Sequence, residues 1–300
     1  MAQTVGFIGI GVMGRPMAGH VLAKGYPLVV HTRTPSTAAT LREAGARVLA
    51  TPSEVAAASD VIITMLPDSP DVEAVLTGPD GVLATLQPGA VVIDMSSISP
   101  SVTQALASRV LAAGGEWLDA PVSGGEVGAV NAALSIMVGG AGATLAQVRP
   151  ILACMGHPDR IIHVGEAPGA GQICKLCNQI AIGGALAGVS EAFALAQKAG
   201  VPLAPVRQAL LGGFAASRVL EVHGERMMQA HYTPGFRTRL YQKDLRLATE
   251  AAAAAGVALP TTATVAQWTN ALCAAGGSEL DYSAIATVLF RLAGLEPQPR

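Results

Sequence analysis

The sequence predicts an α/β protein in which a doubly wound N-terminal domain, residues 1–164, is followed by an all-α domain, residues 165–300. Three observations support this prediction. Apolar segments typical of strands alternate with helical segments over the first half. A long apolar segment after Gly169 is typical of one helix joining the two domains. Beyond Lys198 one helical pattern follows another, with no convincing strand.

The strands expected in the first half are short runs of apolar and β-branched residues. Their continuous rather than alternating apolar character favours parallel strands buried on both faces. Helices are expected after the first strand, after Pro35, after Pro52 and near Pro100, with Ser99 as the N-cap of the last one. The expected strands are TVGFIGI at 4–10, PLVVHT at 27–32, residues 47–49, DVIITMLP at 60–67, AVVIDMSS at 90–97 and EWLDA at 116–120.

A glycine motif, Gly9-Ile10-Gly11-Val12-Met13-Gly14, lies between the first strand and the first helix. The first glycine permits a tight turn, the second lets the backbone approach a pyrophosphate, and the third lets helix and strand pack closely. The N-terminus of the helix then offers free N–H groups to phosphate. We therefore expect a dinucleotide here; the alternative is a glycine turn without a ligand.

The end of the second strand indicates which dinucleotide is bound. An acidic residue there accepts from the ribose hydroxyl of NAD, whereas arginine accommodates the 2′-phosphate of NADP. This chain has Thr32, Arg33 and Thr34 and no acid. The pattern predicts that NADPH is preferred, with NADH possible; the alternative is that Arg33 is an ordinary surface residue.

Two loops follow later strands, at the edge where open parallel sheets bind their ligands. They contain Met65-Leu66-Pro67 and the pair Ser96 and Ser97. We expect both loops to contact the cofactor, with a serine hydroxyl as donor. Because Ser99 directly precedes a proline, it is the better helix cap, which leaves the earlier serines for a ligand.

A third loop, Ser123-Gly124-Gly125, follows the strand EWLDA. A serine hydroxyl and glycine N–H groups suit a small carboxylate without adding a net charge. The alternative is an ordinary glycine loop.

Lys175 is the only charged residue between Ala167 and Ser190, at the start of the long apolar helix. Asn178 and Gln179 lie three and four residues later, so they share its helix face. One interpretation is that this lysine is held in a pocket for a functional purpose. The alternative is a structural lysine whose ammonium reaches out to water.

Composition limits the classes of partner. Of 300 residues, 51% are hydrophobic and 13% charged, which is typical of a globular protein, and the net charge of −2 does not favour nucleic acid. Four cysteines without framework spacing, together with an N-terminus unlike a signal peptide, favour a cytoplasmic protein. The uncharged run 176–190 is shorter than the ~20 residues of a membrane span, so no membrane partner is expected.

Metal ligation is not expected either. The segment containing Cys174 and Cys177 has no matching second pair, and the six histidines lack metal-binding spacing. His223, beside Glu221 and Glu225, is interpreted as part of a helix surface or a subunit contact. The alanine-rich helical domain favours burial of its surplus apolar surface in a homodimer or homotetramer.

Six segments taken together resemble the β-hydroxyacid dehydrogenase family, which includes the 3-hydroxyisobutyrate dehydrogenases. The resemblance covers nearly the whole chain, in order. Within the family, VIDMSSISP, DAPVSGGE and GGFAASRVLEVHGERM are most similar to the branch that reduces tartronate semialdehyde. The six segments are GFIGIGVMGRPMA, DVIITMLPDSP, VIDMSSISP, DAPVSGGEVGA, GAGQICKLCNQ and PGFRTRLYQKDLRLA.

The resemblance implies a Rossmann-type domain like that of 6-phosphogluconate dehydrogenase, a long linking helix and an all-helical domain. It implies that Lys175 is catalytic, that Ser123 and Gly124 bind substrate, and that Lys243 contacts cofactor or substrate. Family members often carry Asn four residues after the lysine, whereas here Asn178 is third and Gln179 fourth. Which of these amides contacts the substrate stays open.

The implied reaction is NADPH-dependent reduction of tartronate semialdehyde (2-hydroxy-3-oxopropanoate) to glycerate. Three other small acids are alternatives within the family: 3-hydroxyisobutyrate, glyoxylate and succinic semialdehyde. An alternative of another class is a dinucleotide sensor without catalysis, against which the lone ammonium and its amide neighbours argue.

Overall fold

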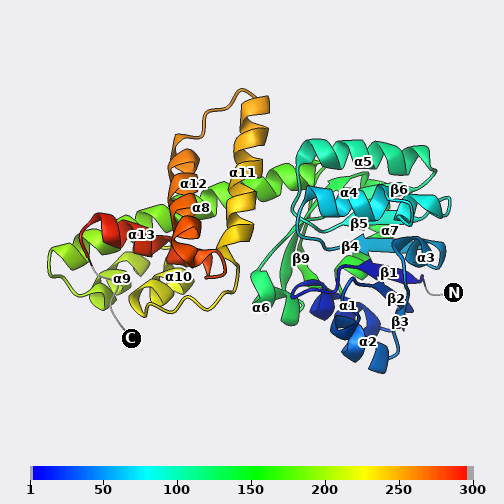
Figure 1. The fold of residues 1–300 in the computed structure, drawn as a ribbon, viewed down its shortest axis with the longest axis horizontal. Coiled ribbons are helices and arrows are strands. Elements are labelled where there is room, and N and C mark those ends of the chain that lie inside the picture. Colours follow the sequence, from blue (N-terminus) through cyan, green and yellow to red (C-terminus); the bar gives the residue numbers. More distant parts are fainter. Residues whose placement is uncertain (1–2, 296–300) are drawn as a thin grey trace. The chain divides into compact units, whose positions relative to one another are not determined.

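The computed structural model of the chain describes residues 3–295. The chain divides into two compact units, Met1–Lys175 and Leu176–Arg300. Figure 1 shows a sheet flanked by helices in the first unit and helices alone in the second. This arrangement confirms the predicted α/β domain followed by a helical domain.

The first unit is built on a nine-stranded sheet. Strands β3-β2-β1-β4-β5-β6 are adjacent in that order and parallel, which is the doubly wound Rossmann-type order. The strands are β1 Val5–Ile8, β2 Leu28–His31, β3 Arg47–Val48, β4 Val61–Thr64, β5 Val91–Asp94, β6 Glu116–Asp119, β7 Val122–Ser123, β8 Leu134–Gly140 and β9 Gly156–Gly165.

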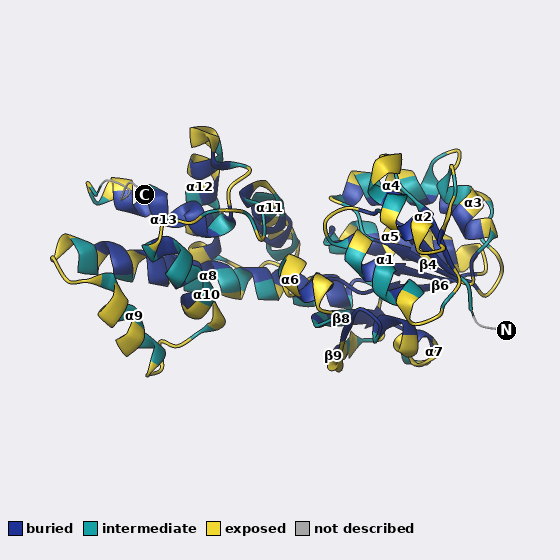
Figure 2. Ribbon diagram, turned by 90° about the horizontal axis from the view of Figure 1, so that it is seen from below, coloured by how far each residue is buried: buried dark blue, intermediate teal, exposed yellow. Residues whose placement is uncertain are grey.

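Helices cover both faces of this sheet, with α1 and α2 on one side of it and α4 and α5 on the other (Figure 1). Alternate side chains of β1 enter different cores: Phe7 packs on the α1 side and Ile8 on the α4 side. Figure 2 shows the buried strands between partly exposed helices. The helices are α1 Gly14–Ala23, α2 Ala39–Glu43, α3 Pro52–Ala57, α4 Ser69–Thr77, α5 Pro100–Ala112, α6 Gly125–Val130 and α7 Gly142–Leu152, with 3₁₀ turns η1 Pro35–Ala38 and η2 Val82–Ala84.

One edge of the sheet departs from the all-parallel prediction. Strand β8 runs antiparallel to β6 and β7, and β9 is parallel to β8. Strands β6 and β7 pair with β8 in one antiparallel register, and the chain turns back after β7 through α6, so β8 enters the sheet in the opposite direction. Strand β8 ends in glycines, and Ser135 interrupts its apolar run. For these reasons the sequence pattern gave little indication of this edge.

Ser99 occupies the N-cap position of α5, as predicted, but its side chain does not cap the helix. Its hydroxyl lies 2.9 Å from the hydroxyl of Ser101, and its own N–H donates to the Ser69 hydroxyl at 3.1 Å. The predicted capping hydrogen bond is therefore wrong, because a neighbouring hydroxyl competes for the same oxygen.

The second unit contains helices in the part of the chain that the structure describes. Ser217 caps α10, where its hydroxyl accepts from the Leu220 N–H at 3.0 Å. Phe193, Tyr241 and Val265 have no exposed side-chain surface and lie in one core. The helices are α8 Ala170–Lys198, α9 Leu203–Leu211, α10 Arg218–Met228, α11 Thr238–Ala254, α12 Pro260–Leu272 and α13 Ile285–Leu292, with short turns Cys273–Gly277 and Tyr282–Ala284.

Helix α8 has 29 residues and is the one described helix whose length and composition would allow it to cross a membrane. Its side chains Leu186 and Phe193 are nevertheless fully buried in the core of the second unit. That burial is typical of the core helix of a globular domain.

Candidate functional site

The glycine turn after β1 packs as the motif predicts. Gly9 has a φ of +102°, and a Cβ there would lie 2.3 Å from the Met65 carbonyl oxygen. A Cβ at Gly14 would lie 1.9 Å from the Gly9 carbonyl oxygen. A Cβ at Gly11, in contrast, would meet no atom within 4 Å. The protein's own packing therefore requires the outer glycines, whereas Gly11 faces open space.

The start of α1 completes a surface suited to a pyrophosphate. Its N-cap residue Met13 makes no side-chain capping bond, and no acidic residue lies in the first turn. Within the first turn the Arg15 N–H donates to the Gly11 carbonyl at 3.0 Å and Pro16 has no N–H. The phosphates would therefore bind at the glycine turn that precedes these residues, where the helix dipole favours an anion. The residues present fit the phosphates of a dinucleotide.

The end of β2 is a turn held by threonine hydroxyls. Thr32 accepts from the Thr34 N–H at 3.2 Å and lies 3.1 Å from the Thr37 hydroxyl. The Arg33 side chain is 81% exposed and forms a 3.4 Å ion pair with Asp71. No acidic side chain occurs between residues 28 and 42. An exposed guanidinium, its Asp71 partner and the threonine hydroxyl groups are thus the functional groups at this strand end.

The loops after β4 and β5 are joined by hydrogen bonds. The Leu66 N–H donates to the Ser96 hydroxyl at 2.9 Å, which links the 65–67 loop to the 96–97 loop. Ser96 is fully buried, whereas Ser97 is partly exposed. Ser96 therefore has a structural contact of its own, and Ser97 is the more accessible of the predicted pair.

Asp94, at the end of β5, lies beneath these loops. Its Oδ1 accepts from the Thr64 hydroxyl at 2.8 Å and from the Ser96 N–H at 3.1 Å. Its Oδ2 is buried without a hydrogen-bond partner. Burial raises the pKa of Asp94 to about 6, against the lowering effect of Ser96 and Thr64. The carboxyl group can therefore change its protonation state near neutral pH.

Asp119, at the end of β6, holds the start of α8. Its Oδ1 accepts from the Gly169 N–H at 2.7 Å and its Oδ2 from the Gln172 N–H at 2.9 Å. Burial raises the pKa of Asp119, while these backbone donors oppose the shift. Since both oxygens accept hydrogen bonds, the ionised form fits this geometry.

Lys175 lies in the second turn of α8 and is only 7% exposed. Ser123 and the two following glycines are accessible, and Gly124 and Gly125 have φ values of +133° and +61°. Two consecutive positive φ values are strained for other residues, which explains the glycine pair. The first unit thus contains a buried ammonium and an accessible serine-glycine loop.

The amides after Lys175 belong to a polar cluster of the second unit. The Gln179 amide nitrogen donates to Asp244 at 2.5 Å, and its oxygen accepts from the Asn178 amide at 2.9 Å. The Tyr241 hydroxyl donates to the Gln179 carbonyl at 3.1 Å, and the Lys243 ammonium lies 3.2 Å from Asp244. Gln179 is thus fixed by structural contacts, whereas Asn178 is partly exposed.

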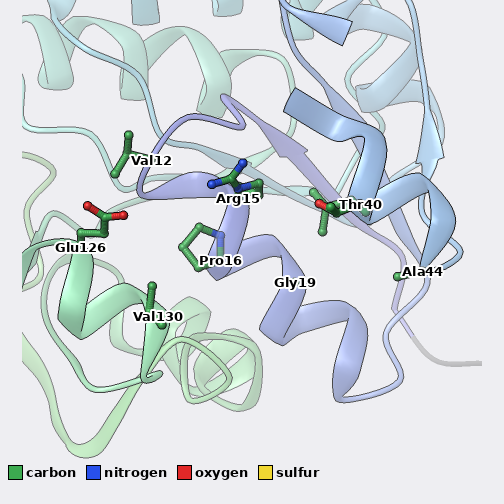
Figure 3. A pocket seen from close by; sticks show the side chains of 9 residues that line it. Val12, Arg15, Pro16, Gly19, Thr40, Ala44, Glu126 and Val130 are labelled. Carbon is green, nitrogen blue, oxygen red and sulfur yellow. The ribbon is translucent and has the colours of Figure 1, made fainter. Parts of the chain in front are cut away.

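A groove of about 390 Å³ lies beside the glycine turn and is open to solvent (Figure 3). Arg15 and Pro16 of α1 line it, with Glu126 of α6 on one side and Thr40 of α2 on the other. Of the predicted site residues it includes Val12 alone. The other predicted site residues do not line this groove.

His223 was interpreted as part of a helix surface or a subunit contact; in the single chain it lies in a polar cluster that is largely buried. Its Nε2 is 2.9 Å from the Tyr282 hydroxyl and its Nδ1 is 3.6 Å from Asp281. Burial by itself would raise the pKa of Asp281, but contacts with His223 and Ser283 and the Arg226 charge hold it well below its usual value. This cluster fixes loops of the second unit. No group of three or more potential metal ligands occurs among the described residues.

Sequence reasoning missed the buried polar residues that support the site. Asp94 and Asp119 each end an apolar strand, and Gln172 stands inside the glycine-rich start of α8. The available signal was a polar residue at the carboxyl end of a strand, where a parallel sheet binds its ligands.

Comparison with known proteins matches both parts of the chain to described domains. Residues 4–165 match the NAD binding domain of 6-phosphogluconate dehydrogenase. Residues 169–289 match the domain described as NAD-binding of NADP-dependent 3-hydroxyisobutyrate dehydrogenase. The chain is 47% identical to 2-hydroxy-3-oxopropionate reductase of Escherichia coli K12, over 95% of this chain and 96% of that protein.

Solved structures agree in fold over the same length. The 3-hydroxyisobutyrate dehydrogenase of Mycobacterium tuberculosis, solved with L-serine, has a TM-score of 0.87 and 34% identity over 96% of this chain and 99% of that one. Psf3 in complex with NADP⁺ and 2-OPP has a TM-score of 0.83 and 26% identity over 95% of this chain and 100% of that one.

Proposed function

Because this chain belongs to the NAD(P)-dependent β-hydroxyacid dehydrogenase family, we propose that it reduces tartronate semialdehyde to glycerate with NADPH, and that Lys175 donates the proton. The chain is an oxidoreductase that acts on the hydroxyl-bearing carbon of a small substrate and uses a nicotinamide dinucleotide. The similarity to 2-hydroxy-3-oxopropionate reductase supports this substrate.

The observation that carries the proposal is the setting of Lys175. Its helix starts against the carboxyl end of β6, because the Gly169 and Gln172 N–H groups bind Asp119 there. The glycine turn lies at the carboxyl end of β1, on the same edge of the same parallel sheet. A buried ammonium on this edge is suited to chemistry beside a bound dinucleotide rather than to a solvated surface.

The reaction requires a hydride at the carbonyl carbon and a proton at the carbonyl oxygen. A nicotinamide dinucleotide, when bound, supplies the hydride. The Lys175 ammonium stabilises the negative charge that develops on the oxygen and then transfers its proton to it. The product is an alcohol, and the neutral lysine regains a proton from solvent before the next turnover.

Substrate orientation is assigned to the accessible loop and to one amide. The Ser123 hydroxyl and the N–H groups of Gly124 and Gly125 bind the substrate carboxylate. The Asn178 amide oxygen is assigned to the substrate hydroxyl, because the Asn178 nitrogen donates to Gln179 and the Gln179 nitrogen donates to Asp244. Lys243 contacts cofactor or substrate in this proposal.

The preference for NADPH rests on the end of β2. Arg33 is exposed, and no acid occurs between residues 28 and 42, where an NAD-binding strand end would have one. A 2′-phosphate would take the place of the Asp71 carboxylate as the partner of the Arg33 guanidinium. The ion pair with Asp71 orients the guanidinium without burying it. The NADP⁺ complex of the structural neighbour Psf3 agrees with this choice.

The test is a panel of small aldehyde and keto acids with NADPH and with NADH, followed at 340 nm. The panel contains tartronate semialdehyde, glyoxylate and succinic semialdehyde, with 3-hydroxyisobutyrate in the oxidative direction. We expect the highest kcat/KM for tartronate semialdehyde with NADPH. A higher kcat/KM for another acid contradicts the substrate, and equal or better use of NADH contradicts the cofactor preference.

The lysine mechanism is tested with Lys175→Ala. We expect kcat to fall by about three orders of magnitude while NADPH binding persists, because only the proton donor is lost. The matched control is Lys198→Ala, which removes an exposed lysine from the last turn of the same helix. Retention of more than about a tenth of wild-type kcat by Lys175→Ala would rule out the proton-donor role.

A further inference from the structure

We propose that Asp119 and Gln172 are positioning residues for Lys175, which fix the first turn of its helix to both ligand-binding loops. The inference rests on the proposed role of Lys175 and extends it to residues that touch neither substrate nor cofactor. Both side chains have no exposed surface. Each makes two hydrogen bonds at the point where α8 meets the sheet.

Asp119 fixes the start of α8 from the side of the substrate loop. Its two oxygens accept from the Gly169 and Gln172 N–H groups, which a helix start otherwise leaves without partners. Asp119 stands four residues before Ser123, and both residues pair with strand β8. One short, paired segment therefore connects the loop assigned to the carboxylate with the helix that contains Lys175.

Gln172 fixes the same turn from the side of the cofactor loop. Its amide oxygen accepts from the Ile98 N–H at 3.2 Å, and its amide nitrogen donates to the Ser96 carbonyl at 2.8 Å. A side-chain amide that satisfies one donor and one acceptor of the same loop leaves that loop little freedom to shift. Lys175 follows Gln172 by three residues, less than one turn of helix.

Gly171 and Gly139 allow the backbone of α8 to lie directly against strand β8. A Cβ at Gly171 would lie 2.3 Å from the Met137 carbonyl oxygen and 2.9 Å from Asp119 Oδ2. A Cβ at Gly139 would lie 2.6 Å from the Gly171 nitrogen. The helix thus begins in backbone contact with β8, so its first turn can move only if the sheet edge moves. This rigidity suits a proton donor, for which an error of 1 Å costs about a hundredfold in rate.

The experiment compares Asp119→Asn and Gln172→Met with wild type. Asparagine keeps the shape of Asp119 but loses one acceptor, and methionine keeps the length of Gln172 but loses both bonds. We expect kcat to fall at least about tenfold, with substrate KM and NADPH Kd within about threefold of wild type, because the ligand contacts remain and the lysine is displaced.

The matched control is Thr51→Ala, which removes the capping bond of α3 in the same unit without touching α8. It should lower thermal stability without lowering kcat. A kcat within about twofold of wild type for both Asp119→Asn and Gln172→Met overturns the proposal.

If the variants do not fold, amide hydrogen exchange in the wild-type protein decides the question. We expect the Gly169 and Gln172 amides to exchange much more slowly than exposed loop amides, and fast exchange there overturns the proposal. The two proposals fail separately. An active Lys175→Ala variant rejects the proton donor, whereas an inactive one beside fully active Asp119 and Gln172 variants rejects only the positioning role.

Discussion

Asp94 and Asp119 end two neighbouring strands and are register partners in the sheet. Both are fully buried, and each accepts N–H groups of the loops that follow or approach it. Their difference lies in the second oxygen: Asp119 uses both, whereas Asp94 leaves Oδ2 without a partner. Burying the ionised carboxylate therefore costs more free energy at Asp94 than at Asp119. A proton can bind to Oδ2 of Asp94 without breaking a hydrogen bond.

A prediction at this scale concerns Asp94→Asn and pH. Folding raises the pKa of Asp94 from 3.8 to about 6. The protonated carboxyl therefore contributes its full stabilisation below pH 3.8, and this contribution is lost as the pH rises through 6. That loss amounts to about 3 kcal/mol. The difference in free energy of unfolding, Asp94→Asn minus wild type, should therefore be more positive at pH 7 than at pH 4, by about 2 to 3 kcal/mol. Urea unfolding at both pH values measures it, and a constant difference would contradict it.

At the scale of elements, the short helix α6 packs against α1, and one side chain adds hydrogen bonds to that contact. His20 of α1 donates from Nε2 to the carbonyls of Ala129 and Val130 at 3.1 and 2.9 Å. Since carbonyl oxygens only accept, the proton of the ring must lie on Nε2. Helix α6 begins at Gly125, so this contact links the dinucleotide helix to the end of the proposed carboxylate loop.

The corresponding prediction is made for His20→Ala. Loss of a partly buried hydrogen bond of about 1 kcal/mol should loosen α6 and raise substrate KM about fivefold. NADPH binding should change less, because the glycine turn is untouched. His20→Gln, which keeps a donor, serves as the control and should lie closer to wild type. Steady-state kinetics distinguish the variants, and an unchanged KM for both would show that α6 does not depend on this contact.

At the scale of the whole molecule, the second unit leaves apolar side chains exposed. Helix α9 has no buried residue, and Leu195, Phe214 and Leu292 are largely open to solvent. Exposed apolar surface of this kind commonly lies in an interface between subunits. We therefore propose that the chain forms a homodimer or homotetramer.

Light scattering coupled to size exclusion tests this assembly. The chain has a mass of 30.3 kDa, so we expect a particle of at least twice that mass. Phe214→Ser should shift the distribution towards the monomer, whereas Val48→Ser, an exposed apolar position in the first unit, should not. A wild-type mass equal to that of one chain would refute the proposal.

Local chemistry explains why so much of the fold was predictable from the sequence. The central strands are continuous apolar runs, and Gly9 and Gly14 are required by contacts with backbone atoms close in sequence or in the adjacent strand. The helix starts at Ser217 and Pro260 follow from a capping serine and from a proline in the first turn. These features depend on residues that are close in sequence, so they can be predicted from a single sequence.

The sequence by itself determined the doubly wound sheet, the helical second half and the set of strand-end loops and lysine proposed for chemistry. Only the tertiary structure decided the mixed edge formed by β7, β8 and β9, the pairing of Gln179 with Asp244, and the bonds from Asp119 and Gln172 to their partners. The hydrogen bonds of Asp119 and Gln172 span 50 to 76 residues. A buried polar residue has no local pattern that names its partner, because that choice depends on which distant backbone group the fold leaves without a hydrogen bond.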